Sequence, residues 1–300
     1  ALKRGLRYET KLGVNPFKFG LVGSTDTHTA LSTTDEAQYF GKITILEPAP
    51  SEQRFHELVA GRTNPNGLDI GVEAWQVSSA GLAAVWAREN TREALWDAMQ
   101  RKEVYATTGT RPVVRVFAGW DFADGDQQRP DFVRYGYANG VPMGGDLVAA
   151  PQGKAPTFLI HAAKDPNNAN LDRIQLIKGW SDADGEIHER IWDVAVSDGR
   201  SIGLDGRCRT PVGSTVDVAD ASYRNSIGAP ALTGFWRDET FDPTERAFYY
   251  VRVLEIPTPR WTTYDAKFFQ RDIPKGAPTE IQERAYTSPV WYTPGQGPAG

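Results

Sequence analysis

The sequence predicts an α+β protein in two parts, an incomplete α/β portion over residues 1–110 and an antiparallel β-sandwich-like domain over residues 111–300. Helix-type spacing of apolar residues is found in the first part and gives way, at Pro112, to short alternating runs. Turns rich in Gly, Pro and Asp separate these runs, which is typical of a sandwich. The first part also contains too few strand and helix units to close an eight-stranded barrel by itself.

In the first part, apolar residues at helical spacing predict a helix over residues 2–12 that ends at Gly13. Residues 17–22 form a short apolar run that predicts a buried strand. Ser51 is a plausible N-cap for a helix that runs to residue 60, and Thr91 begins a helix to residue 102. A strand over residues 104–106 follows. Because an apolar strand such as 17–22 normally has neighbours on both sides, we expect an exposed apolar edge here or a partner that covers it.

In the second part, alternating runs predict strands over residues 114–116, 157–162, 174–180, 186–194, 215–218 and 247–256. Asp184 and Gly185 lie between two of these runs and predict a hairpin turn. His161 and His188 fall within strand runs, where we expect hydrogen-bonded structural histidines.

Composition limits the partners of the protein. A chain of 300 residues with 40% hydrophobic content can bury a sizeable core. Its net charge is −5 and no Lys/Arg cluster is present, which argues against a nucleic-acid partner and against an anionic membrane surface. Cys208 is the single cysteine, so an intrachain disulfide and a thiolate zinc site are excluded, while the compartment stays open.

The turn after residues 17–22 places Asp26 and His28 two residues apart. Such a pair can bind a divalent metal, act as an acid/base couple, or form a polar turn in which Asp26 accepts backbone N–H bonds. A hard carboxylate oxygen and a neutral imidazole nitrogen are the mixed donor set that zinc, manganese and iron favour. Spacing alone leaves the metal site and the polar turn as open alternatives.

A second polar turn, Thr-Thr-Gly-Thr-Arg over residues 107–111, precedes the strand at 114–116. Its hydroxyls, its Gly109 amide and the Arg111 guanidinium lie close together and could hold an oxyanion or a phosphate group, with Thr108 as the weaker choice. In the alternative interpretation the hydroxyls cap backbone groups and Arg111 pairs with a surface carboxylate.

The motif Ser-Thr-Asp-Thr-His over residues 24–28 resembles the last metal-binding motif of the polymerase-and-histidinol-phosphatase (PHP) metallohydrolase superfamily. Residues 78–111, 140–147 and 249–261 resemble a bacterial family of unknown function related to it. The resemblance implies that residues 1–110 are the carboxyl-terminal part of a PHP-type α/β barrel. It implies hydrolysis of a small-molecule phosphoester or related ester, with Asp26 and His28 as metal ligands and Arg111 and Thr108 on the substrate anion.

The metal site that this resemblance implies is incomplete in the sequence. PHP enzymes open with a His-x-His strand, which is absent among the four histidines here, His28, His56, His161 and His188. The chain also begins at Ala1 inside a predicted helix. We therefore expect most metal ligands to come from a missing amino-terminal part of the same protein or from a companion chain. The alternative is a non-catalytic β-sandwich binding or interaction module with a degenerate barrel remnant, which metal content would distinguish.

Overall fold

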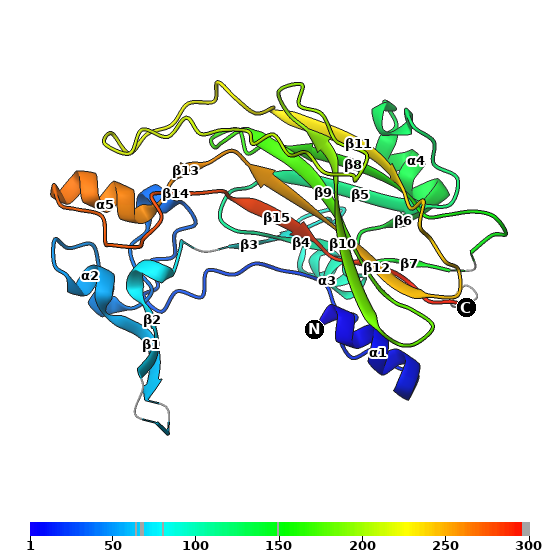
Figure 1. Ribbon diagram of the computed structural model, residues 1–300, viewed down its shortest axis with the longest axis horizontal. Helices are drawn as coiled ribbons and strands as arrows, with labels where there is room; N and C mark the ends of the chain where they lie inside the picture. Colours follow the sequence, from blue (N-terminus) through cyan, green and yellow to red (C-terminus); the bar gives the residue numbers. More distant parts are fainter. Residues whose placement is uncertain (64, 67–68, 80, 149, 296–300) are drawn as a thin grey trace.

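A computed structural model describes residues 1–63, 65–66, 69–79, 81–148 and 150–295, and it shows a mixed α+β fold with mostly antiparallel sheets (Figure 1). The helices are α1 (Leu2–Leu12), α2 (Gln53–His56), α3 (Arg92–Gln100), α4 (Phe132–Asn139) and α5 (Trp261–Phe269). Within the described ranges, none of the helices has the length and apolar character needed to cross a bilayer.

The strands fall into two large sheets and two small pairs, and the described residues close no barrel. They are β1 (Leu58–Thr63), β2 (Asp69–Glu73), β3 (Leu82–Val85), β4 (Val104–Thr107), β5 (Val113–Gly119), β6 (Gly140–Pro142), β7 (Asp146–Leu147), β8 (Thr157–Ala163), β9 (Leu171–Ser181), β10 (Ile187–Val196), β11 (Ala231–Arg237), β12 (Arg246–Glu255), β13 (Thr258–Pro259), β14 (Glu280–Ile281), β15 (Arg284–Thr287) and β16 (Val290–Tyr292).

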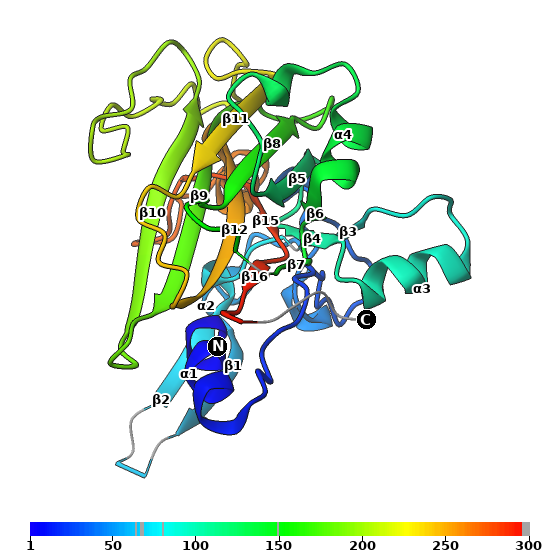
Figure 2. The same ribbon diagram turned by 90° about the vertical axis from the view of Figure 1, so that its right-hand side faces the viewer.

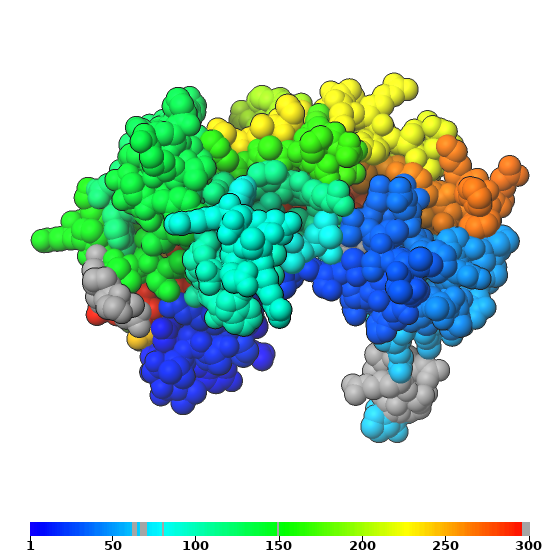
Figure 3. Space-filling view, turned by 180° about the vertical axis from the view of Figure 1, so that it is seen from behind, coloured from blue at the N-terminus to red at the C-terminus, as the bar shows by residue number. Residues whose placement is uncertain are grey.

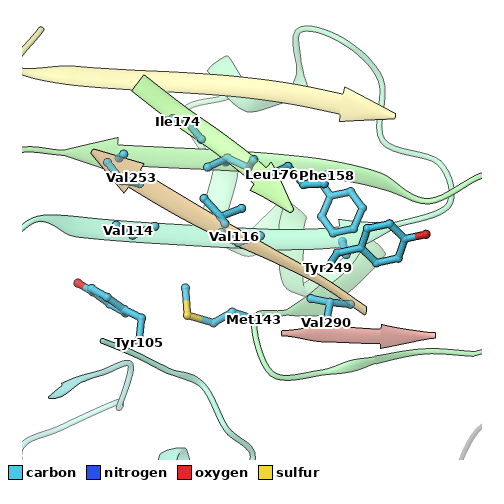
Figure 4. Close-up of a cluster of buried hydrophobic side chains, with 14 of the residues drawn as sticks. Tyr105, Val114, Val116, Met143, Phe158, Ile174, Leu176, Tyr249, Val253 and Val290 are labelled. Carbon is cyan, nitrogen blue, oxygen red and sulfur yellow. The ribbon is translucent and has the colours of Figure 1, made fainter. Parts of the chain in front are cut away.

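The two large sheets pack face to face. The eight-stranded sheet has the order β10-β9-β12-β15-β4-β3, with β16 paired to β12 and β7 paired to β16. The four-stranded sheet has the order β11-β8-β5-β6. A large apolar cluster lies between them, in which Val116 and Phe158 of the smaller sheet meet Leu176 and Tyr249 of the larger one (Figure 4). Burial of apolar side chains from both sheets is thus the main source of stability for this part of the molecule.

Most of the predicted second-part strands are confirmed. The runs at 157–162, 174–180, 186–194 and 247–256 correspond to β8, β9, β10 and β12. The predicted turn joins β9 to β10, where Gly185 has a φ of 78° and the Asp182 carboxylate accepts N–H bonds from Asp184 and Glu186. Figure 2 shows β9 and β10 side by side as the longest hairpin of the molecule.

The eight-stranded sheet draws strands from both sides of residue 110, where the sequence predicts a domain boundary. β3 and β4 come before this residue, and β4 pairs with β15 near the end of the chain, with Thr107 opposite Ala285. The change from helical to alternating pattern therefore does not coincide with an interruption of the hydrogen-bonded sheet.

The predicted buried strand at 17–22 is wrong, because this segment has no strand partner in the described structure and Phe19 and Val22 are exposed. It is an extended segment whose Leu21 N–H donates to the Ser288 hydroxyl at 2.9 Å. Leu31, farther along the same stretch, is exposed as well. The expected exposed edge of a sheet is therefore not formed here, and the segment instead has exposed apolar side chains on extended chain.

Four other elements differ from the sequence-based expectation. The predicted helix from Ser51 to residue 60 is wrong beyond the short α2, because the following residues pair with β2 as a hairpin strand. The predicted strand at 215–218 is wrong, since only an isolated bridge between Asp217 and Ser222 forms there. Helices α4 and α5 have no predicted counterpart, because their apolar residues form short runs without clear helical periodicity. Helix α4 packs against β5 and β6, and Trp261 of α5 packs against Tyr39 and Phe55.

One end of the molecule is a separate lobe that contains α2, the β1–β2 hairpin and α5 (Figures 1 and 3). The buried guanidinium of Arg54 holds it together by donating to the carbonyls of Tyr39, Phe40 and Leu46 and by pairing with Asp265 at 2.8 Å. The same group lies 4.4 Å from the centroid of the Trp261 ring. This contact joins residues 39–54 to α5, which is why two segments far apart in the sequence form one unit.

Candidate functional site

The turn that carries Asp26 and His28 lies against the ends of β3 and β4. Gly23 N–H donates to the Leu82 carbonyl at 3.2 Å, and Gly81 N–H donates to the Ser24 carbonyl at 3.1 Å. A Cβ atom at Gly23 would lie 2.6 Å from the carbonyl oxygens of Leu82 and Thr107. Glycine is therefore what lets the backbone approach the sheet this closely and start the turn at this point.

Asp26 and His28 face each other on the exposed side of this turn. Their Oδ1 and Nε2 atoms are 3.5 Å apart, and the two side chains are 75% and 62% exposed. Asp26 has a φ of 47°, in the left-handed region that aspartate tolerates better than most residues. The His28 N–H donates to the Lys42 carbonyl at 2.9 Å, which ties the turn to the next segment of chain.

The carboxylate of Asp26 already attracts a cation. The Lys42 ammonium pairs with Asp26 Oδ2 and also donates to its main-chain oxygen. The hydrogen bond from Lys42 to the carboxylate and the charge of Lys42 lower the pKa of Asp26 below its usual value. Within the part of the chain that the structure describes, no group of three His, Cys, Asp or Glu side chains could hold a metal. Because catalytic zinc uses three protein ligands, this pair fits a divalent metal only as part of a larger donor set.

The second predicted turn lies elsewhere, and the hydroxyls of Thr108 and Thr110 are hydrogen-bonded to carboxyl groups. Thr108 Oγ1 donates to the Glu283 carboxylate and accepts the Arg284 N–H at 2.9 Å. Arg111 is exposed, and its N–H donates to Asp165 Oδ2 at 3.0 Å. The bond from the Arg284 N–H agrees with the interpretation in which the hydroxyls cap backbone groups, whereas the bond to Glu283 joins two side chains. Arg111 is one of the residues that line a cavity that the sequence did not predict.

This cavity has a volume of about 170 Å³ and is strongly acidic. Its carboxyl groups come from five residues in four separate segments, against the single positive side chain of Arg111. The lining residues are Thr34, Asp35, Glu36, Gly109, Thr110, Arg111, Asp165, Asn167, Asn168, Tyr223, Glu255, Thr258, Pro259, Tyr264 and Glu283. Neither Asp26 nor His28 is among them, so the structure places the two predicted turns at different sites.

Burial shifts the pKa values of two cavity glutamates, Glu255 and Glu283, into the neutral range. Burial raises the pKa of Glu255 to about 7, against a hydrogen bond from Thr110 that acts in the opposite direction. Burial also raises the pKa of Glu283 to about 8, although Thr108 donates to it, and the charges of Glu36 and Glu255 act in the same direction as burial. Both groups therefore exchange protons near neutral pH, which ordinary surface glutamates do not.

The other two buried carboxyls of the cavity are satisfied by backbone groups. Glu36 accepts the N–H groups of Ser79 and Trp261, each at 2.7 Å, although burial raises its pKa. Burial also opposes ionisation of Asp165, but N–H bonds from Asn167, from the Asn168 side chain and from Arg111 hold its pKa below the usual value. These two side chains therefore position the walls of the cavity.

A profile of the family described as "Protein of unknown function (DUF3604)" matches residues 1–294. The chain belongs to the DUF3604 family. Comparisons with curated proteins and with solved structures gave no match. Because the family description assigns no activity, the function of this DUF3604 protein has to be inferred from its own residues.

This DUF3604 chain thus has an exposed Asp–His turn and a buried acidic cavity. The local Asp-x-His motif predicted the Asp–His turn. Glu255 and Glu283 were not predicted. Their only signals in the sequence are that Glu255 ends a long apolar strand and that Glu283 precedes a short one. Arg111 was predicted to bind an anion, whereas the structure places it in a cavity wall with five carboxyl residues.

Proposed function

We propose that this DUF3604 protein is a PHP-like metal-dependent hydrolase of phosphoesters or related esters. In this proposal residues 1–110 are an incomplete PHP-type barrel portion and the following residues form a β-sandwich-like accessory domain. The observation that carries it is the juxtaposition of Asp26 Oδ1 and His28 Nε2, 3.5 Å apart on an exposed turn. An oxygen and a nitrogen donor held together by backbone contacts suit zinc, manganese or iron.

The remaining ligands would come from an amino-terminal part of the same protein or from a companion chain. Exposed apolar side chains on the segment that carries the turn, Phe19, Val22 and Leu31, support this, since such a part would bury them. The Lys42 ammonium already pairs with the Asp26 carboxylate, so it has to move away if a metal binds there.

A bound divalent metal would supply Lewis acidity and lower the pKa of a bound water. The residues of this chain would have simpler tasks. Asp26 would hold the metal through its carboxylate, and His28 would hold it through a neutral imidazole nitrogen. Arg111 and Thr108, which the sequence suggests for the substrate anion, lie away from the Asp–His turn, Arg111 on the wall of a cavity with five carboxyl residues and Thr108 bonded to one of them.

Replacing either donor should remove metal and activity together. In the complete protein, Asp26→Ala or His28→Ala should lower both bound transition metal and hydrolytic turnover at least tenfold, because no neighbouring described residue can take the place of the lost donor. Metal is measured by elemental analysis of the purified protein, and turnover on aryl phosphate and aryl sulfate esters.

The hairpin offers a matched control, because Asp182 and His188 form another Asp–His pair, 2.6 Å apart. Asp182→Ala and His188→Ala should leave metal and turnover unchanged. If Asp26→Ala and His28→Ala also retain both, the turn is only a polar turn and the hydrolase proposal is lost.

Arg111→Ala tests whether the second turn takes part in the reaction. We expect metal content and kcat/KM for the aryl ester to be unchanged, because Arg111 lies among five carboxyl residues away from the Asp–His turn. Arg209→Ala is the control, because Arg209 is an exposed arginine that pairs with Asp205. A fall of about tenfold in kcat/KM in Arg111→Ala, with Arg209→Ala unchanged, would place Arg111 at the substrate anion.

A non-catalytic binding module is the second candidate, and the acidic cavity favours it. Its walls are built from strands and loops of both large sheets together with residues 34–36, and none of its lining residues belongs to the Asp–His turn. Absence of stoichiometric transition metal from the complete protein would favour this candidate over the hydrolase.

A further inference from the structure

The acidic cavity contains a carboxyl oxygen that lacks a hydrogen-bond partner. Glu255, at the end of β12, is 1% exposed. Its Oε1 accepts the Thr110 hydroxyl at 2.6 Å, whereas its Oε2 is buried and has no partner among the described residues. Buried polar atoms are almost always hydrogen-bonded, so an unpartnered oxygen on a cavity wall indicates a group that binds there.

Charged groups around Glu255 leave the cavity with excess negative charge. Glu283, Glu36, Asp35 and Asp165 line it from other segments, and Arg111 is the single basic residue among the lining residues. The nearby Lys164 directs its ammonium to the carbonyls of Asp165 and Asn168, at 2.9 and 2.5 Å. Arg284, next to Glu283, donates to the Gln282 carbonyl.

The hydrogen bonds that the cavity carboxylates already accept argue against a metal ion in the cavity. Asp165 and Glu36 use their oxygens to accept N–H groups, and the described residues contain no group of three carboxylates or imidazoles arranged around one point. An anion is disfavoured by the five carboxyls. The side chains of Tyr223 and Tyr264 add aromatic rings to the walls, which attract organic cations as well as hydrogen-bond donors.

We propose that this cavity is a binding site for the primary ammonium group of a small organic amine, with Glu255 as its main partner. An ammonium carries three N–H donors, which can reach Glu255 Oε2 and the neighbouring Glu283 carboxyl. The volume of about 170 Å³ admits an amine with a short carbon chain. The site does not depend on metal binding at the Asp–His turn.

Amine binding should be coupled to proton release. The pKa values of Glu255 and Glu283 lie near neutrality, and a bound ammonium favours the ionised forms of both. Arg111 and Lys164 are the basic residues nearest to the two glutamates, and Tyr223 and Tyr264 stay neutral over this range because burial raises their pKa values. Affinity should therefore increase from pH 6 to pH 8.

Calorimetric titrations of the complete protein with methylammonium, butylammonium and 1,4-diammoniobutane test this proposal. We expect at least one amine to bind saturably, at least tenfold more tightly at pH 8 than at pH 6, with a buffer-dependent heat that reports proton release. The neutral analogues methanol, 1-butanol and 1,4-butanediol should not bind.

Glu255→Gln and Glu283→Gln should each weaken amine binding at least tenfold, while Glu239→Gln, at an exposed position away from the cavity, should not. Thermal unfolding of each variant verifies that the fold is retained. The proposal is overturned if no amine binds saturably, if binding survives in Glu255→Gln, or if manganese or calcium binds in a Glu255-dependent manner while the amines do not.

Discussion

The free energy of unfolding should decrease by several kcal/mol as the pH rises from about 5 to about 8.5, because Glu255 and Glu283 bind protons more tightly in the folded protein. Their pKa values rise from 4.5 to about 7 and about 8 on folding. Between the unfolded and folded values the folded state holds more protons, so the stabilisation present below pH 4.5 is lost as the pH rises through this window. For Glu255 alone the loss is about 3 kcal/mol, since one pKa unit corresponds to about 1.4 kcal/mol.

Glu255→Gln isolates this contribution, because glutamine stays neutral at every pH. We expect the variant and the original protein to have similar stability near pH 5, and the variant to be more stable by about 3 kcal/mol near pH 8.5. Urea unfolding at a series of pH values measures the difference. Glu239→Gln, where the original carboxylate is 79% exposed, should leave the pH profile unchanged. Parallel profiles for Glu255→Gln and the original protein would show that Glu255 ionises normally.

Arg54→Met should lower the free energy of unfolding by about 3–5 kcal/mol, the cost typical of breaking a buried ion pair from one side. Arg54 is 1% exposed and its removal leaves the carbonyls of Tyr39, Phe40 and Leu46 without their donor. It also leaves Asp265 without its cation. Burial already raises the pKa of Asp265, and without Arg54 the carboxyl is expected to take up a proton at a higher pH still.

Chemical denaturation of Arg54→Lys and Arg134→Met completes the experiment. Lysine restores the charge but lacks the planar group that reaches several acceptors at once, so it should recover only a minor part of the lost stability. Arg134 is 83% exposed, and its replacement should change stability by less than about 1 kcal/mol. A loss below about 1 kcal/mol in Arg54→Met would show that the lobe of α2 and α5 is held by other contacts.

Local signals in the sequence were enough to predict the elements whose caps and hydrogen bonds lie within a few residues of one another. Helix α1 ends at Gly13, whose φ of 75° closes the helix, and α3 begins at Thr91, whose hydroxyl accepts the Ala94 N–H. Strands β8, β9, β10 and β12 followed from alternation. The Asp26 and His28 pair was also local, because a two-residue spacing on one turn already brings the side chains together.

The sequence was misleading where neighbours decide the structure. Residues 17–22 are apolar enough for a buried strand, yet in the described structure no other strand pairs with them, and Phe19 and Val22 are exposed. The residues after α2 form β1 because β2 offers them a partner, which overrides the helical start at Ser51. Pairing partners far along the chain are not encoded in the pattern of a single segment.

The sequence by itself determined the α+β class, the main strands, the two capped helices and the adjacency of Asp26 and His28, because each depends on residues a few positions apart. Only the tertiary structure decided where the buried charges lie. Glu255 and Glu283 face one cavity with Thr110, Asp165 and Glu36 because β12, the start of β15 and three loops converge there. Burial in that shared space, and not the local sequence, moves their pKa values toward neutrality and leaves one carboxyl oxygen for a ligand.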